Sequence, residues 1–336
     1  MKAPYIIAEM SANHCGDKEL AFKIIKAAKD AGADAVKIQT YTADTITLNS
    51  KDEIFMIKSG LWAGQSLYEL YQKAYTPWEW QKELFDYAKT VGIDFFSTPF
   101  DFSAVDFLES IGVPMYKIAS FEAIDYPLIS YAAKFKKPMI ISTGISSYEE
   151  ILEAIEACKK VGNNDVTILK CTSSYPAPVD KMDLITVKDM FEKFSPMGVK
   201  VGLSDHSMSL VPPITATALG ASVIEKHFTL DRALGGEDSG FSLNFNEFKE
   251  MTSAVRDTAL AMGRVNYELN QANRHGARSL FASTNIKKGE ILTAANVRSV
   301  RPASGLHPRY YEQILGKKAA RDINFATPLA LEDIEF

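Results

Sequence analysis

Short apolar segments alternate with amphipathic segments over most of the chain. The apolar segments are rich in Val, Ile and Phe, which is typical of strands buried on both faces, and the segments between them repeat apolar residues at helical spacing. A glycine often stands between a helical segment and the next strand, where its easy access to the left-handed conformation ends the helix. The pattern predicts eight strands, at Tyr5–Ala8, after Gly32, Gly92 and Gly112, and at Pro138–Ser142, Val166–Leu169, Val199–Leu203 and Val223–Ile224.

Eight strands that alternate with helices predict a (β/α)8 TIM barrel. A doubly wound open sheet, the alternative α/β fold, usually has fewer strands and a glycine-rich first turn that this chain lacks. Helix caps are expected at Thr76, before the helix to Val91, and at Ser147, before the helix to Val161, because a Glu follows each of them three residues later.

One long excursion interrupts this alternation, between the second and third strands. It spans Thr42–Tyr75 and contains the aromatic residues Trp62 and Tyr68, which make it too apolar for a linker. Insertions after a barrel strand lie over the open face where barrel active sites form. We therefore expect this segment to form a lid or a wall of a substrate site.

The pattern changes after the helix near Phe248–Met262. The connector Gly263–Arg278 is polar and can bury little apolar surface, and the tail beyond it combines short strands with turn glycines and prolines. We expect a barrel domain at residues 1–265, a linker at 266–280 and a β-rich domain at 281–336. A domain this small is marginally stable alone and is expected to dock on another surface.

Composition and charge narrow the function. The 336 residues are 46% apolar and carry a net charge of −5, which argues against a nucleic-acid or anionic-membrane partner. No apolar run approaches the roughly 18 residues of a membrane span. The three cysteines show no CxxC spacing, so neither a disulfide framework nor a zinc cluster is expected. The N-terminal segment soon becomes polar, which favours a cytoplasmic protein.

Two histidines follow neighbouring predicted strands. His206 comes directly after the strand Val199–Leu203 and its polar end, and His227 occupies the same place after Val223–Ile224. The C-terminal ends of neighbouring parallel strands lie side by side, so the two imidazoles can form half of a metal site. The alternative is that each histidine makes only local hydrogen bonds.

Two lysines lie within apolar strand segments. Lys37 follows Ala35-Val36 and Lys117 follows Met115-Tyr116. A lysine inside a strand is costly unless a negative charge faces it, and nearby Ser and Thr hydroxyls favour a bound phosphate or carboxylate. The alternative is an ion pair of each lysine with a barrel carboxylate such as Glu9 or Glu122.

Eight short motifs mark the ends of the predicted strands: Ile7-Ala8-Glu9-Met10, Asn13-His14-x-Gly16, Val36-Lys37-Ile38-Gln39-Thr40, Ser97-Thr98-Pro99-Phe100, Lys117-Ile118-Ala119-Ser120, Ser142-Thr143-Gly144, Gly202-Leu203-Ser204-Asp205-His206 and Glu225-Lys226-His227-Phe228. Together they resemble the sialic acid synthase family. The resemblance covers essentially the whole chain, including the tail, which is similar to the family's antifreeze-like (SAF) domain. Lys117–Glu122 and the Trp62-x-Gly64-x-x-Leu67-Tyr68 stretch are most similar to the pseudaminic acid synthase branch.

The resemblance implies condensation of phosphoenolpyruvate (PEP) with the open-chain aldehyde of an acetamido sugar, a 2,4-diacetamido-2,4,6-trideoxy hexose of the altrose type. The products are a nine-carbon 2-keto (nonulosonic) acid and phosphate. It also implies a divalent metal, Mn²⁺ or Mg²⁺, on His206 and His227. Catalytic roles are implied for Glu9, Lys37 and Glu122, PEP contacts for Lys37, Thr98, Lys117, Ser120, Ser142, Ser173 and Ser204, and sugar contacts for Gln39, Tyr175, Asp238 and Arg301.

The resemblance further implies a homodimer in which the SAF domain of one chain completes the active site of the other, with Arg301 reaching the sugar. Other branches, the N-acetylneuraminate and legionaminate synthases, remain alternatives. A metal-dependent hydrolase on the same barrel usually opens with His-x-His, whereas this chain has the single His14 after its first strand. A non-catalytic sugar-binding protein would not need interior lysines beside a metal pair.

Overall fold

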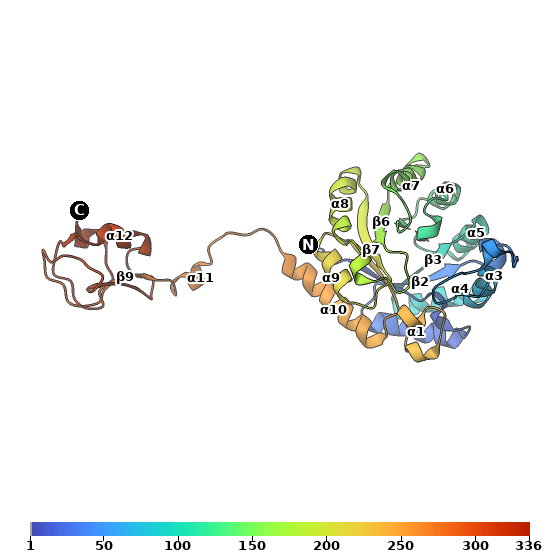
Figure 1. Cartoon of the computed structure of the whole chain (residues 1–336), viewed down its shortest axis with the longest axis horizontal. Helices are drawn as coiled ribbons and strands as arrows, with labels where there is room; N and C mark the ends of the chain where they lie inside the picture. The colour runs from blue at the N-terminus through green and yellow to red at the C-terminus, as the bar shows by residue number, and fades with distance from the viewer. Residues whose placement is uncertain (1) are drawn as a thin grey trace. The chain divides into compact units, whose positions relative to one another are not determined.

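The computed structural model describes residues 2–336 and confirms the predicted TIM barrel. Eight parallel strands close in the order β1 to β8, and helices surround them (Figure 1). The strands are β1 (Tyr5–Glu9), β2 (Ala35–Thr40), β3 (Asp94–Pro99), β4 (Tyr116–Ile118), β5 (Met139–Ser142), β6 (Val166–Cys171), β7 (Lys200–Asp205) and β8 (Val223–His227).

Each barrel strand is followed by a helix, and the excursion after β2 adds two short ones. The helices of the barrel unit are α1 (Lys18–Asp30), α2 (Ala43–Ile46), α3 (Leu67–Ala74), α4 (Trp78–Val91), α5 (Phe102–Ile111), α6 (Tyr126–Ala133), α7 (Tyr148–Lys160), α8 (Ile185–Phe194), α9 (Val211–Ala218) and α10 (Phe245–Met262). Their buried faces and the outward faces of the strands form one continuous apolar core.

One of the two predicted helix caps is confirmed and the other is wrong. Ser147 caps α7, accepting a hydrogen bond from the Glu150 backbone N–H at 3.2 Å. The N-cap of α4 is Pro77, with no side-chain cap. The Thr76 hydroxyl instead lies 3.1 Å from His14 Nε2, and both side chains are buried. The sequence has a capping pattern, but the Thr76 hydroxyl hydrogen-bonds to His14, which is distant in the sequence, instead of to the first turn of α4.

The interior of the barrel has an apolar layer below its open end. One inward side chain from each of six strands builds this layer: Ile7, Ala35, Phe96, Ile140, Leu169 and Val223. On β7 the layer contains Gly202, where an added Cβ would lie 2.3 Å from the Val223 carbonyl oxygen and 2.6 Å from the Leu169 side chain. Glycine is required there because the neighbouring side chains already fill the space.

A second compact unit spans Arg264–Phe336, after the barrel unit ends at Gly263. It has its own apolar core, built around residues such as Leu280, Leu292 and Ile314. Its elements are α11 (Gln271–Arg274), β9 (Ser279–Ala282), β10 (Val297–Val300), α12 (Tyr311–Ile314), β11 (Lys318–Ala319) and β12 (Ile334–Glu335), with β9 pairing antiparallel to β10 and β11 to β12. Over residues 2–336, no helix combines the length and the apolar character needed to cross a membrane.

Candidate active site

A polar layer lies directly above the apolar layer of the barrel interior. Side chains two residues apart on a strand point to the same side. The residues two positions beyond Ile7, Ala35, Phe96, Ile140, Leu169 and Val223 are therefore also inward, and they are Glu9, Lys37, Thr98, Ser142, Cys171 and Glu225. Along each of these strands, the inward side chain thus changes from apolar to polar over two residues, and the polar layer lies directly above the apolar one.

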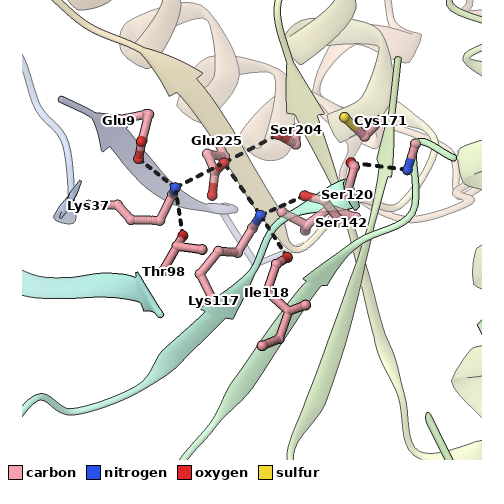
Figure 2. A network of polar contacts seen from close by, with 12 residues as sticks. Glu9, Lys37, Thr98, Lys117, Ile118, Ser120, Ser142, Cys171, Ser204 and Glu225 are labelled. Atoms are coloured by element: carbon pink, nitrogen blue, oxygen red, sulfur yellow. Dashed lines mark hydrogen bonds and ion pairs between the residues drawn. The ribbon is translucent and has the colours of Figure 1, made fainter. Parts of the chain in front are cut away.

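Two lysines and two carboxylates form the centre of this polar layer, as Figure 2 shows. Lys37 Nζ lies 2.6 Å from Glu9 Oε2 and donates to Thr98 Oγ1 at 3.2 Å. Lys117 Nζ donates to Ser142 Oγ at 2.7 Å and to the Ile118 carbonyl at 3.2 Å. Glu225 Oε1 lies 3.7 Å from both lysine nitrogens and links the two halves.

The charges of this cluster are mutually dependent because all four side chains are buried. Burial alone would raise the pKa of Glu225, but Lys117 and Lys37 lower it below its ordinary value, so Glu225 is ionised. Burial and the neighbouring Glu225 raise the pKa of Glu9 even though Lys37 opposes them. Burial lowers the pKa of Lys117 despite Glu225. Burial would lower the pKa of Lys37, but Glu225 and Glu9 raise it above its ordinary value, so an additional anion would face one firmly charged lysine, Lys37, and one whose charge depends on its partners.

The lysines thus have the barrel carboxylate partners that the alternative interpretation required, and of the two carboxylates given there as examples only Glu9 is one of them. Lys37 pairs with Glu9, whereas Lys117 pairs with Glu225 and not with Glu122. The hydroxyls expected around an anion are also present, because each lysine donates to a Ser or Thr side chain. Both features coexist at the same ammonium groups.

The two histidines meet above the lysines. Their ring centroids are 5.3 Å apart. His206 Nδ1 lies 3.1 Å from the Thr172 carbonyl oxygen, so this ring makes the local hydrogen bond of the alternative interpretation. His227 Nδ1 is buried and has no hydrogen-bond partner among the described residues. Asp238 Oδ2 lies 3.8 Å from that nitrogen, beyond hydrogen-bonding distance.

These residues fit a metal with two protein ligands. Burial and the neighbouring His206 hold the pKa of His227 well below its ordinary value, so the ring is neutral and one of its two nitrogens carries a lone pair that a metal can bind. Over residues 2–336, no group of three or more His, Cys, Asp and Glu side chains is arranged to hold a metal. The remaining ligands of such a metal would have to come from water or substrate.

A cavity of about 540 Å³ opens above the polar layer. The excursion after β2 forms one wall of it, with Ile46, Ile57, Leu67 and Leu70 among the lining residues. The cavity is therefore polar at its base and apolar on this side. A volume of several hundred cubic ångströms suits a small-molecule ligand.

Three aromatic side chains connect this wall to the histidines. The Tyr175 ring lies 4.3 Å from the His206 ring and the Phe241 ring 4.9 Å from the His227 ring, between centroids. Trp62, from the excursion, contacts both aromatic rings, at 6.0 Å and 6.4 Å. The expected wall thus reaches the position directly above the histidine pair.

Glu122 is the carboxylate best suited to exchange a proton. It ends a short 3-10 helix (Ser120–Glu122) after β4 and lines the cavity. Burial raises its pKa to about 7, against the opposing effect of Lys117, and its Oε2 has no hydrogen-bond partner among residues 2–336. A carboxyl group with a pKa near neutrality can both donate and accept a proton under ordinary conditions.

Most of the predicted site residues come together in this cavity. Thr98 is buried behind Lys37 and does not line it, and Arg301 is an exposed residue of the second unit. The lining includes Glu9, Lys37, Gln39, Lys117, Ser120, Glu122, Ser142, Ser173, Tyr175, Ser204, His206, His227 and Asp238.

The structure brings into the site two residues to which the sequence analysis gave no role, although one of them, Glu225, belongs to one of the strand-end motifs. Glu225, the shared partner of both lysines, stands two residues before His227 on β8, and this spacing could have identified it as inward. Cys171 Sγ lies 3.9 Å from both Ser173 Oγ and His206 Nδ1. Burial would raise the pKa of this thiol, but His206 and Lys117 lower it to about 7. No motif in the sequence marked Cys171.

Comparison with known proteins gives a consistent result. The NeuB family profile matches residues 24–267 and the SAF domain profile matches residues 277–335. A pseudaminic acid synthase of Campylobacter jejuni is 51% identical, with 99% of this chain and 97% of that protein covered. One of Helicobacter pylori is 48% identical over 100% and 99% of the two chains. The solved structure of an N-acetylneuraminic acid synthetase of Leptospira borgpetersenii superposes with a TM-score of 0.72 at 30% identity, covering 81% of this chain and 89% of that one.

Proposed function

The chain belongs to the NeuB family, as its resemblance to sialic acid synthases predicted, and we propose that this enzyme is a pseudaminic acid synthase. The proposed reaction condenses PEP with a 2,4-diacetamido-2,4,6-trideoxy hexose of the altrose type. C3 of PEP attacks the open-chain aldehyde carbon, and water attacks C2 of the PEP moiety. The products are a nine-carbon 2-keto acid and phosphate.

The proposed PEP site is the base of the cavity. Lys37 and Lys117 supply positive charge, and the Ser142, Ser120 and Ser204 hydroxyls lie along the same surface. Next to them an added Cβ on Gly144 would lie 2.2 Å from Ser173 Oγ and 2.9 Å from Ser120 Oγ. The absence of a side chain at this position lets hydroxyls from two loops approach each other and the Gly144 backbone, as an anion site requires. Thr98 would act through Lys37, to which it is bonded.

The proposed metal, Mn²⁺ or Mg²⁺, would be held by His206 and His227, and when bound it would polarise the sugar aldehyde and orient water. The chain's own contribution is to present two imidazoles 5.3 Å apart at the cavity wall and to keep His227 neutral. The unpartnered His227 Nδ1 supports this role, because a buried polar atom without a partner is costly unless a ligand satisfies it.

The sugar would occupy the upper part of the cavity. Gln39, Tyr175 and Asp238 line it and offer polar contacts, while the excursion after β2 presents apolar side chains. A trideoxy sugar carries a methyl group and acetamido methyl groups, which can pack on such a wall, whereas a hexose with all its hydroxyls would leave some of them without partners. Glu122 and Glu9, whose pKa values burial raises, are the groups proposed to transfer protons.

The observation that carries this proposal is the joint placement of the lysine pair and the histidine pair on one cavity. The decisive experiment incubates the full chain with PEP, Mn²⁺ and a panel of acetamido sugars, and measures phosphate release and product mass. We expect turnover with the trideoxy sugar and none after EDTA treatment. Preferred turnover of N-acetylmannosamine would favour the neuraminate branch instead, and sugar binding without phosphate release would indicate a non-catalytic protein.

We also propose a homodimer in which Arg301 of one chain reaches the sugar bound in the barrel of the other. The connector between the two units supports it. Val265, Tyr267 and Leu269 alternate with polar residues and are 86%, 94% and 62% exposed, which leaves apolar side chains available to a second chain. Arg301 is itself exposed, as a guanidinium that reaches a separate site must be.

Subunit mixing tests this arrangement. Arg301→Ala and His206→Ala chains should each be inactive, and a mixture that exchanges subunits should recover part of the activity, because one intact barrel then meets one intact SAF domain. Arg298→Ala, which changes an exposed arginine on β10, is the matched control and should remain active. Proven exchange without recovery, or full activity of a monomer, would contradict the proposal.

A further inference from the structure

Lys226 is a buried lysine that faces away from the cavity. It lies between Glu225 and His227 on β8, and the strand period turns it to the opposite side from both. Its register partner on β7 is Asp205, whose Oδ2 lies 2.5 Å from Lys226 Nζ. The side chains of Lys226 and Asp205 are 1% and 0% exposed, respectively. This ion pair is separate from the lysine and carboxylate cluster inside the barrel.

The ammonium group also holds the loop that follows β7. Lys226 Nζ donates to the Ser207 carbonyl and, at 3.3 Å each, to Ser207 Oγ and the Ser209 carbonyl. Asp205 Oδ1 in turn accepts from the Ser207 backbone N–H at 2.8 Å. These contacts lie on both sides of His206 in the sequence, so they fix the backbone that carries its ring.

From this geometry we propose that Lys226 is a positioning residue that sets His206 opposite His227 for metal binding. It is adjacent to His227 in the chain and bound to both neighbours of His206, so one side chain couples the two proposed ligands. A buried ion pair is a weak source of stability, since a well-packed apolar pair often replaces it without loss. Directional bonds to a loop carbonyl are what an apolar pair cannot supply, and residues that orient metal ligands commonly control metal affinity.

This inference rests on the proposed metal site, and the experiment distinguishes a failure of the positioning role of Lys226 from a failure of the metal site itself. The probe is Mn²⁺ alone, titrated into the full-length chain and followed by the electron paramagnetic resonance signal of free Mn²⁺. Lys226→Met should weaken Mn²⁺ binding by about 10- to 100-fold. Hydrogen exchange should also become faster at residues 206–211, with little change in β1 on the other side of β8.

A double variant keeps the test independent of folding. Lys226→Met leaves Asp205 as an unpaired buried charge and should lower the melting temperature, whereas Lys226→Met/Asp205→Asn has no unpaired charge and should regain most of it. Asn at position 205 also retains an oxygen that can accept from the Ser207 N–H. We expect the double variant to keep the weak Mn²⁺ binding and the fast loop exchange, because neither substitution restores the ammonium group that donates to both the Ser207 and the Ser209 carbonyls.

Two control variants calibrate these effects. Lys200→Met removes an exposed ion pair with Asp165 at the opposite end of β7 and should leave Mn²⁺ binding unchanged. Val255→Ala removes buried apolar atoms from the core side of α10, so it should lower the melting temperature but leave Mn²⁺ binding unchanged. A double variant with normal Mn²⁺ affinity and normal loop exchange would overturn the positioning role. If His206→Ala also binds Mn²⁺ normally, the metal site itself is wrong, which is a different result.

Discussion

Replacing Glu122 by Gln should make the protein more stable and less active at the same time. Burial raises the pKa of Glu122 to about 7 from its ordinary value of 4.5, and its Oε2 has no partner among the described residues. The ionised carboxylate is therefore unfavourable in the folded chain. Gln has nearly the same shape and cannot ionise, so it removes this cost together with the proton.

The magnitude follows from the difference between the two pKa values. Between pH 4.5 and about pH 7 the folded chain holds a proton that the unfolded chain has released, so stability falls as pH rises through this window. At about 1.4 kcal/mol per pH unit, the ionised group costs about 3 kcal/mol above pH 7. The variant should thus equal the wild type near pH 4 and exceed it at pH 8.5, where its melting temperature should be roughly 6 °C higher.

Thermal unfolding followed by circular dichroism across this pH range measures the effect directly. Glu250→Gln is the matched control, because Glu250 is exposed on α10 and removing its charge should change the melting temperature little at any pH. In the activity assay we expect Glu122→Gln to lower kcat by about 10² to 10⁴, the usual contribution of a proton-transfer group. The inflection near pH 7 in the wild-type kcat/KM profile should be absent.

Two outcomes would refute this reasoning. A melting temperature difference that does not change with pH would mean that Glu122 titrates normally in the folded chain. A variant with the wild-type pH profile would mean that Glu122 is a structural residue of the cavity wall, and proton transfer would then fall to Glu9, whose pKa burial also raises.

Two further predictions concern the substrate contacts. Lys117→Met should raise the KM for PEP by about 100-fold with little effect on the KM for the sugar, because a charge-assisted bond to the phosphate or carboxylate of PEP is lost. The control is Lys170→Met, which changes a lysine on β6 whose amine donates to the Cys171 carbonyl, and it should change neither KM. Trp62→Ala should raise the KM for the sugar several-fold and leave the KM for PEP unchanged. Leu61→Ala, which changes an exposed neighbour, is the control, and equal effects of the two variants would contradict a specific role of Trp62 in the wall.

The sequence predicted the strands well but ended them too early. The pattern stopped β8 at Ile224 and β7 at Leu203, whereas these strands continue to His227 and Asp205. The missing residues are polar because they face the cavity or the buried ion pair at the open end of the barrel. A hydrophobic pattern therefore ends where the site begins, and the early ends mark the site rather than the end of the strand.

The membership of the site could be predicted because the ends of parallel barrel strands always meet on one face. Its pairings could not. A pairing of Lys117 with Glu122 is reasonable from the sequence, since the two lie only five positions apart on one strand and its following turn. In the folded chain Lys117 lies instead beside Glu225, from the strand on the far side of the closed barrel. A contact across the barrel interior has no signature in sequence spacing.

Register explains why the same few residues serve both the lysines and the histidines. On β1, Glu9 is the register partner of Lys37 on one side and of His227 on the other. On β7, Ser204 pairs with Glu225 and Asp205 with Lys226. Sliding any of these strands by one residue would turn Glu9 or Glu225 out of the barrel and bring Ala8 or Lys226 inward. The apolar floor opposes such a slip, because Ile7 and Val223, two residues before Glu9 and Glu225, would leave their packed layer at the same time. The packing of the floor therefore fixes the positions of the charges above it.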